Sequence, residues 1–306
     1  MKPAPLKPHA RLALVAPSSP IYEAKNRQAA IALLEEMGFS VQVYESVSAQ
    51  RGYLSGSDRI RARDLMDAFA DPEIDGVICL RGGYGAARLL PLIDFEVIRQ
   101  HPKVFVGFSD ITALHLSIYA HTGLVTYHGP MPGAQSLTGL RDPRSRRMWL
   151  DTLGGDPPRE MYNPGGDPFC SFSGKGTAEG ILVGGNLSVL CSLLATPYLP
   201  DFTDKLLLLE DVGERPYRID RMINQLRTSG IFDSIAGLVL GDFTQCEEEA
   251  SPRTLALEEI FRELLPPELP VLWNVHAGHG RDKMTLPLGE PYRLDADKAT
   301  LTRLNY

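Results

Sequence analysis

The sequence predicts an α/β protein of two domains: an N-terminal open parallel sheet with flanking helices, and a smaller C-terminal mixed α/β domain. Over the first 130 residues, short β-branched runs alternate with helical periods, which is typical of crossover units and a parallel sheet. Between about 130 and 175, glycine and proline pairs interrupt this alternation. The length of 306 residues also suits about two domains of roughly 100–200 residues each.

The N-terminal half follows a regular order of strands and helices. After the first apolar run, alanine and leucine residues recur at three- and four-residue intervals, which indicates a crossover helix that Gly38 ends. Asp58 is expected to cap the second helix. The expected strands are 11–16, 41–44, 76–80, 103–108 and 125–127, and the expected helices are 25–37, 58–70 and 110–121.

The second half is predicted to be a separate unit with a different mixture of elements. Strands are expected at 177–183, 205–210 and 237–241, helices at 218–228 and 255–265, and short strands in the last twenty residues. We therefore expect an N-terminal domain over 1–150, a linker over 151–170 and a C-terminal domain over 171–306.

Composition and charge exclude several classes of protein. The net charge of −7 and the lack of a long basic run argue against a nucleic-acid partner. The four cysteines form no CxxC pair, which predicts neither a zinc site nor a redox pair and favours a reducing compartment. The uncharged stretches 111–140 and 181–200 contain histidine, glycine or proline and predict buried interior rather than a membrane span. The N-terminal apolar run is too short for a secretory signal, so we expect the cytoplasm.

Ser109 occupies a position suited to a nucleophile. It follows the apolar run 104–107, and a helix is predicted immediately after it. Ligands bind at the carboxyl ends of strands in open α/β sheets, and a serine on such a turn presents its hydroxyl above the sheet. The alternative is that Ser109 only caps the helix. The surrounding residues are not GxSxG, so an α/β-hydrolase is not directly indicated.

The segment 80–87 places Gly82, Gly83 and Gly85 at another strand end. Glycines there let backbone N–H groups approach a phosphate or a developing oxyanion. The segment lacks GxGxxG and P-loop spacing, so a tight turn is the competing interpretation.

A carboxylate and a histidine occupy comparable positions later in the chain. Glu210 ends the apolar run 206–209, and His279 lies between two glycines, where it can enter a narrow cleft as a general base. A solvated Glu210 and a turn histidine are the simpler alternatives. His276 and His279 could pair as metal ligands, but no third ligand has suitable spacing. Taken together, Ser109, Glu210 and His279 form the set of groups that acyl transfer requires.

Six motifs follow one another along the chain, at 81–90, 107–110, 180–188, 207–214, 217–221 and 278–289. Together they resemble the motifs of the LD-carboxypeptidase family of serine peptidases. The resemblance runs from the first strand to Gly289. Where family members often have asparagine after Gly-His-Gly, this chain has the segment 281–285 without one.

The resemblance implies a cytoplasmic murein-recycling enzyme that removes the terminal D-alanine of a murein tetrapeptide by cutting an L–D peptide bond. Ser109 would be the nucleophile, His279 the general base and Glu210 its partner. The backbone N–H groups of Gly83 and Asp110 would form the oxyanion hole, and Gly82 and Tyr84 would contact the substrate.

The family also implies an architecture and an assembly. Its members pair a glutamine-amidotransferase or flavodoxin-like N-terminal domain with a smaller swivelling C-terminal domain, and they are often homodimers. The catalytic cleft would then lie between the domains. No metal or other cofactor is expected.

Three other functions remain open from the sequence. Related self-immunity peptidases cleave peptidyl-nucleotides and need an aromatic platform for the nucleotide base. Neither Trp149 nor Trp273 lies in an obvious long insertion that could provide one. We therefore favour a muropeptide as the substrate. A two-lobed, non-catalytic binding protein would share the cleft without a reactive serine. An esterase on an α/β sheet would prefer activated esters.

Overall fold

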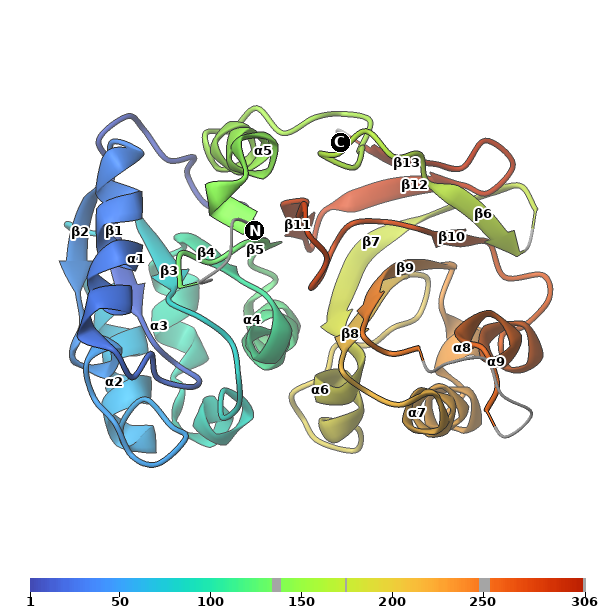
Figure 1. Ribbon diagram of the computed structural model, residues 1–306, viewed down its shortest axis with the longest axis horizontal. Coiled ribbons are helices and arrows are strands. Elements are labelled where there is room, and N and C mark those ends of the chain that lie inside the picture. The colour runs from blue at the N-terminus through green and yellow to red at the C-terminus, as the bar shows by residue number, and fades with distance from the viewer. Residues whose placement is uncertain (134–138, 174, 248–253, 305–306) are drawn as a thin grey trace.

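A six-stranded sheet forms the N-terminal part of the computed structural model, which describes residues 1–133, 139–173, 175–247 and 254–304. The strand order is β11-β5-β4-β3-β1-β2, and only β11 runs antiparallel to its neighbour (Figure 1). These strands are β1 (Arg11–Val15), β2 (Ser40–Val43), β3 (Gly76–Cys79), β4 (Val104–Gly107), β5 (Thr126–His128) and β11 (Leu286–Leu288).

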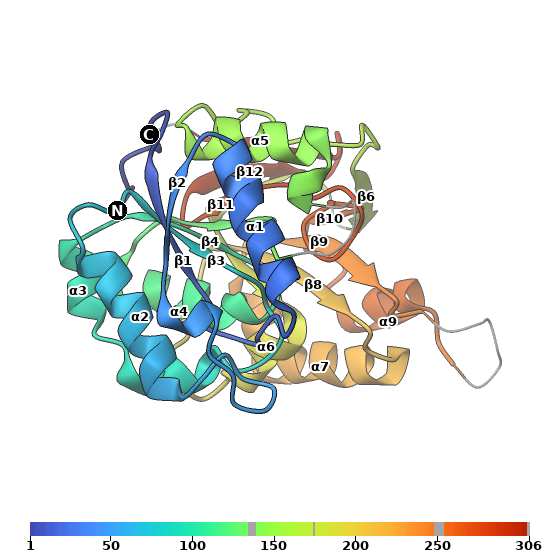
Figure 2. The same ribbon diagram turned by 60° about the vertical axis from the view of Figure 1, so that its left-hand side comes forward.

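Helices pack on both faces of this sheet, as Figure 2 shows. One face packs against α1 and α5 through Leu33, Leu34 and Trp149, and the other packs against α2 and α4 through Leu65 and Leu114. The helices of this part are α1 (Ala24–Glu36), α2 (Asp58–Ala70), α3 (Phe95–Gln100), α4 (Thr112–Thr122) and α5 (Pro143–Leu153).

A seven-stranded mixed sheet forms the C-terminal part, in the order β13-β12-β7-β8-β9-β10-β6. Its strands are β6 (Cys170–Ser173), β7 (Thr177–Asn186), β8 (Leu206–Val212), β9 (Gly237–Thr244), β10 (Val271–Trp273), β12 (Pro291–Asp295) and β13 (Thr300–Arg303). Its helices are α6 (Leu187–Ser192), α7 (Pro216–Thr228), α8 (Ile231–Ser234) and α9 (Leu257–Leu264).

The two parts share packing and one strand. A single apolar cluster joins Phe105 and Leu114 of the first part to Leu187 and Leu209 of the second. The C-terminal segment also returns to the first sheet, where β11 pairs with β5. Residues from both parts therefore meet at the ends of β4 and β8.

All predicted strands and helices are present, with ends that differ by a few residues, and the mixed α/β fold with two sheets is confirmed. One detail is wrong: Ser57, not Asp58, caps α2, because Ser57 Oγ accepts from the Ile60 N–H at 3.3 Å. The segment expected to be irregular contains α5, whose cap Asp142 accepts from two backbone N–H groups. The domain limits at 150 and 170 and a swivelling motion stay predictions.

Among the described residues, no helix combines the length and apolar character needed to cross a membrane.

Candidate active site

Ser109 lies on a tight turn between β4 and α4. Its φ of +64° falls in the left-handed region, which is uncommon for a residue with a side chain and indicates local strain. Close packing surrounds this turn: a Cβ on Gly107 would stand 2.6 Å from Ile111, and one on Gly82 would stand 2.9 Å from the Ser109 Cβ. The turn therefore presents the Ser109 hydroxyl at the carboxyl end of the sheet, as an exposed nucleophile requires.

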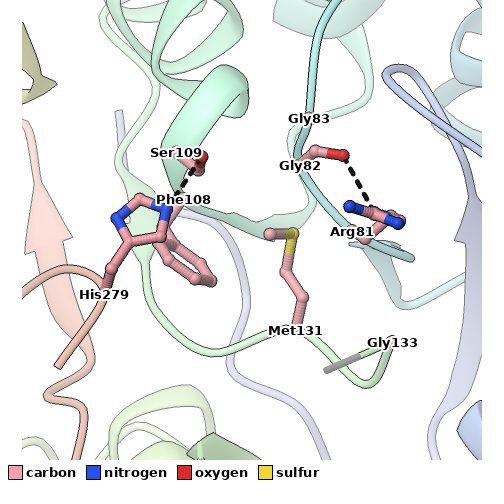
Figure 3. A pocket seen from close by; sticks show the side chains of 8 residues that line it. All are labelled: Arg81, Gly82, Gly83, Phe108, Ser109, Met131, Gly133 and His279. Carbon is pink, nitrogen blue, oxygen red and sulfur yellow. Dashed lines mark hydrogen bonds between the residues drawn. The ribbon is translucent and has the colours of Figure 1, made fainter. Parts of the chain in front are cut away.

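His279 connects Ser109 to a buried carboxylate. Its Nε2 lies 3.0 Å from Ser109 Oγ, and its Nδ1 lies 2.7 Å from Glu210 Oε2 (Figure 3 shows the His279 and Ser109 side chains). The Glu210 side chain is fully buried, whereas 18% of the His279 side chain is exposed. This arrangement allows His279 to accept the Ser109 proton while Glu210 holds the tautomer with hydrogen on Nδ1.

Glycine permits the close approach of Glu210 and the His279 loop. A Cβ on Gly241 would stand 2.3 Å from the carbonyl oxygen of Ala277 and 3.0 Å from the Glu210 Cβ. At the carboxylate itself, a Cβ on Gly278 would stand 2.6 Å from Glu210 Oε2. The absence of side chains at both positions lets β8 and the loop close around the hydrogen bond between Glu210 and His279.

Lys283 stabilises the loop that carries His279. Its Nζ donates to the carbonyl oxygens of Gly278 at 2.7 Å and Gly280 at 2.9 Å, the two residues that flank His279. It also lies 4.9 Å from the centre of the Phe108 ring, which faces the imidazole of His279 at the same distance. Burial lowers the pKa of Lys283, and nearby carboxylates, Asp242 first among them, oppose this shift.

The glycine-rich loop is tied to the serine turn by the Asp110 carboxylate. Asp110 Oδ2 accepts from the Ser18 hydroxyl at 2.5 Å and from the Ala86 N–H at 2.8 Å. Gly83 has a φ of +124°, and a Cβ there would stand 2.4 Å from Ser19 Oγ. Gly83 and Ser109 line the same two cavities, and Asp110 follows Ser109 directly, so an oxyanion hole made of the Gly83 and Asp110 N–H groups is compatible with this arrangement. That role stays a prediction.

Two cavities meet at Ser109. The first, of about 370 Å³, is lined by Ser109, His279, Phe108, Met131, Gly133 and the segment 81–83 (Figure 3). The second, of about 310 Å³, is lined by Ser109, Asp110, Tyr84 and Asn186 among others. Ser109 is therefore accessible from both cavities.

The remaining predicted residues have different surroundings. Gly82 lines the first cavity and Tyr84 the second, where 54% of Tyr84 is exposed and its ring packs edge-on against Tyr53. His276 forms a hydrogen bond to Asp282 at 2.9 Å. Within the described part of the chain, no cluster of three or more potential metal ligands occurs.

Both tryptophans lie away from the two cavities. Trp149 is fully buried in α5, with Phe39 against its edge. Trp273 in β10 stacks on Phe172 at 5.2 Å. Neither lines the cavities at Ser109, so neither provides an aromatic platform there.

Sequence reasoning missed several residues of the site. Met131 and Gly133 line the first cavity from a segment that carries no recognisable motif. The contact between the two parts was also missed: the Asn186 N–H donates to Thr112 Oγ1 at 2.9 Å, three residues after Ser109. Both residues belong to stretches noticed in the sequence, but nothing in the sequence pairs Asn186 with Thr112.

Family models identify the relationship of the chain to known proteins. The N-terminal domain of LD-carboxypeptidases matches residues 12–129, and the C-terminal domain matches residues 179–294. The chain belongs to the LD-carboxypeptidase family. The resemblance stated from the motifs is thereby confirmed, and the chain is a peptidase of this family.

Relatives in the LD-carboxypeptidase family align with nearly the whole chain. A probable murein peptide carboxypeptidase of Bacillus subtilis is 36% identical over 98% of this chain and 93% of that protein. The murein tetrapeptide carboxypeptidase of Pseudomonas aeruginosa is 34% identical over 94% of each.

Solved structures agree with this assignment. A muramoyltetrapeptide carboxypeptidase from Oxalobacter formigenes superposes with a TM-score of 0.82 at 29% identity, over 97% of this chain and 99% of that one. The microcin C7 self-immunity protein MccF, bound to aspartyl sulfamoyl adenosine, superposes with a TM-score of 0.85 over 99% of this chain and 98% of that one. At 24% identity, the second match shows the fold alone.

Proposed function

We propose that this protein is a serine carboxypeptidase that removes the terminal D-alanine of a murein tetrapeptide by cutting the L–D peptide bond. The observation that carries the proposal is the pair of hydrogen bonds that His279 makes, at 3.0 Å to Ser109 and at 2.7 Å to Glu210. A histidine shared in this way between a hydroxyl and a buried carboxylate is the arrangement that activates a serine.

The reaction proceeds in two steps. Ser109 Oγ attacks the carbonyl carbon before D-alanine, and its proton passes to His279 Nε2, while Glu210 stabilises the imidazolium. The N–H groups of Gly83 and Asp110 bind the negative oxygen of the tetrahedral intermediate. His279 then protonates the leaving amine of D-alanine, and an ester on Ser109 remains.

In the second step, water replaces D-alanine on the same side of the acyl carbon. His279 takes a proton from this water, which attacks the ester, and returns a proton to Ser109 Oγ as the bond breaks. The products are D-alanine and the shortened peptide. Ser109, Glu210 and His279 are regenerated unchanged.

A direct comparison of substrates tests this proposal. Purified protein is incubated with a murein tetrapeptide that ends in diaminopimelate-D-alanine, and free D-alanine is measured. We expect D-alanine and tripeptide in equal amounts. No D-alanine above the buffer control would contradict the proposal.

Cleavage of peptidyl-nucleotides is the second candidate, and the sequence likeness to the microcin C7 self-immunity protein MccF of Escherichia coli, 27% identical over 91% of this chain, favours it. MccF itself has been solved with aspartyl sulfamoyl adenosine. The positions of Trp149 and Trp273 argue for the murein peptide, because neither lines the cavities at Ser109. Aspartyl sulfamoyl adenosine is therefore the competing substrate in the same assay. We expect a kcat/KM for it at least tenfold below that for the tetrapeptide.

Two further classes are separated by chemical probes. A fluorophosphonate should label Ser109 and leave the Ser109→Ala variant unlabelled, whereas a non-catalytic binding protein would not react. An esterase would hydrolyse p-nitrophenyl acetate far faster than the tetrapeptide.

A homodimer and a cytoplasmic location stay predictions. Light scattering of the purified protein tests whether it is a homodimer.

A further inference from the structure

Arg81 is a charged side chain in the active-site cavity without an acidic partner. It follows β3 and is half-buried, and of the described residues that line the cavity containing Ser109 and His279, it alone carries a full charge. Its Nε donates to the carbonyl oxygen of Gly82 at 3.2 Å, and its Nη1 donates to that of Pro20 at 3.4 Å.

These two contacts leave the guanidinium incompletely paired. Across the described ranges of the chain, Arg81 makes no ion pair with Asp or Glu, and its Nη2 makes no hydrogen bond. Two neighbouring arginines differ: Arg61 and Arg88 both pair with Asp58. A partly desolvated guanidinium that keeps some of its N–H donors free is suited to bind a planar anion such as a carboxylate.

The chemistry of the site determines which part of a substrate lies near Arg81. The leaving amine takes its proton from His279, so the leaving residue must lie on the His279 side of Ser109. The first cavity contains Ser109, His279 and Arg81, whereas the second contains Ser109 without His279. Figure 3 shows Arg81 and His279 on opposite sides of the first cavity, with Met131 between them.

We propose that Arg81 binds the free carboxylate of the C-terminal residue and thereby restricts the enzyme to the last peptide bond. This inference rests on the proposed carboxypeptidase function. The ligand is the α-carboxylate of a small amino acid whose amine faces His279. An internal bond or a C-terminal amide would place a neutral group beside Arg81.

A cycle of two variants and two substrates tests this role. The substrates are the murein tetrapeptide and the same peptide with a C-terminal amide, and the variants are Arg81→Gln and Arg81→Lys. We expect the unmodified enzyme to prefer the acid over the amide in kcat/KM by roughly 10- to 100-fold, the strength of a charge-assisted contact. In Arg81→Gln this preference should fall to within about threefold, because the acid should lose much more kcat/KM than the amide does.

Arg81→Lys separates charge from structure, because it keeps the charge and should recover part of the preference for the acid. An equal loss on acid and amide in Arg81→Gln would overturn the inference, since it would indicate a purely structural role. Equal cleavage of both peptides by the unmodified enzyme would overturn it as well.

Binding measurements keep the two proposals distinct. If the unmodified enzyme releases D-alanine from neither peptide, the proposed function fails. In that case, calorimetry with Ser109→Ala still tests Arg81, because the acid should bind at least tenfold more tightly than the amide. The same preference persisting in the double variant with Arg81→Gln would overturn the inference.

Discussion

Gly278 lies so close to Glu210 that a Cβ on it would stand 2.6 Å from Oε2, the oxygen that contacts His279. Gly278→Ala should therefore push the carboxylate or the His279 loop aside. We expect kcat/KM on the tetrapeptide to fall at least about tenfold, because a small misplacement of catalytic groups is costly.

Gly166→Ala is the matched control, because Gly166 also has a positive φ, of +90°, but a Cβ there would meet nothing within 4 Å. Both variants place alanine at a positive φ, but only Gly278→Ala also creates a clash with Glu210. Equal kcat/KM values for the two variants would show that the contact between Gly278 and Glu210 has no catalytic importance.

Lys283→Met should affect both stability and rate. The change removes both Nζ hydrogen bonds and leaves the carbonyls of Gly278 and Gly280 without these donors. We expect the free energy of unfolding in urea to fall by roughly 1–3 kcal/mol, and kcat to fall because the loop is held less firmly. Lys25→Met, at an exposed ion pair with Glu23, is the control and should change both quantities little. A wild-type kcat and unfolding free energy in Lys283→Met would contradict the role of this lysine.

His115 should make the protein sensitive to acid. Burial lowers the pKa of His115 to about 4 in the folded protein, against 6.5 for an unperturbed histidine. Between these values the unfolded chain binds a proton that the folded protein does not. The stabilising contribution is therefore complete above pH 6.5 and is lost as pH falls toward about 4. It amounts to about 2 kcal/mol between pH 7 and pH 5.

His115→Gln tests this linkage by urea unfolding at pH 7 and pH 5. The glutamine cannot take up the proton, so the loss of unfolding free energy on acidification should be smaller by about 2 kcal/mol. His128, whose pKa burial also lowers, remains in the variant and contributes to the residual acid dependence. The same pH dependence in both proteins would show that His115 is not the group responsible.

The predictable part of the fold was the part with regular local patterns. In α1, the buried residues Ala30, Leu33 and Leu34 recur at three- and four-residue intervals, because one face of the helix is buried. In β8, the apolar run before Glu210 reflects the burial of that part of the strand. Both patterns can be recognised in the sequence alone. The α5 helix was missed because its Pro143, which opens the helix, lies among prolines and glycines that indicate turns.

The candidate triad was predictable because each member ends a strand or lies between glycines. The residues that support it were not, since their importance depends on contacts between distant segments. Lys283 binds the loop of His279, Thr112 accepts from Asn186, and the Asp110 carboxylate joins the serine turn to the glycine-rich loop. The pattern of residues within one segment cannot predict a contact with a distant segment. The pairing of β11 with β5 was not predicted for the same reason.

The release of D-alanine by the Ser109→Ala variant tests the central claim most directly. The variant removes only the Oγ that contacts His279 at 3.0 Å, so its circular dichroism and melting temperature should match those of the unmodified protein. We predict that its turnover of the murein tetrapeptide is at least about 10³-fold lower, because the members of a triad act as a unit. A rate of D-alanine release within tenfold of the unmodified enzyme would contradict the assignment of Ser109 as the nucleophile.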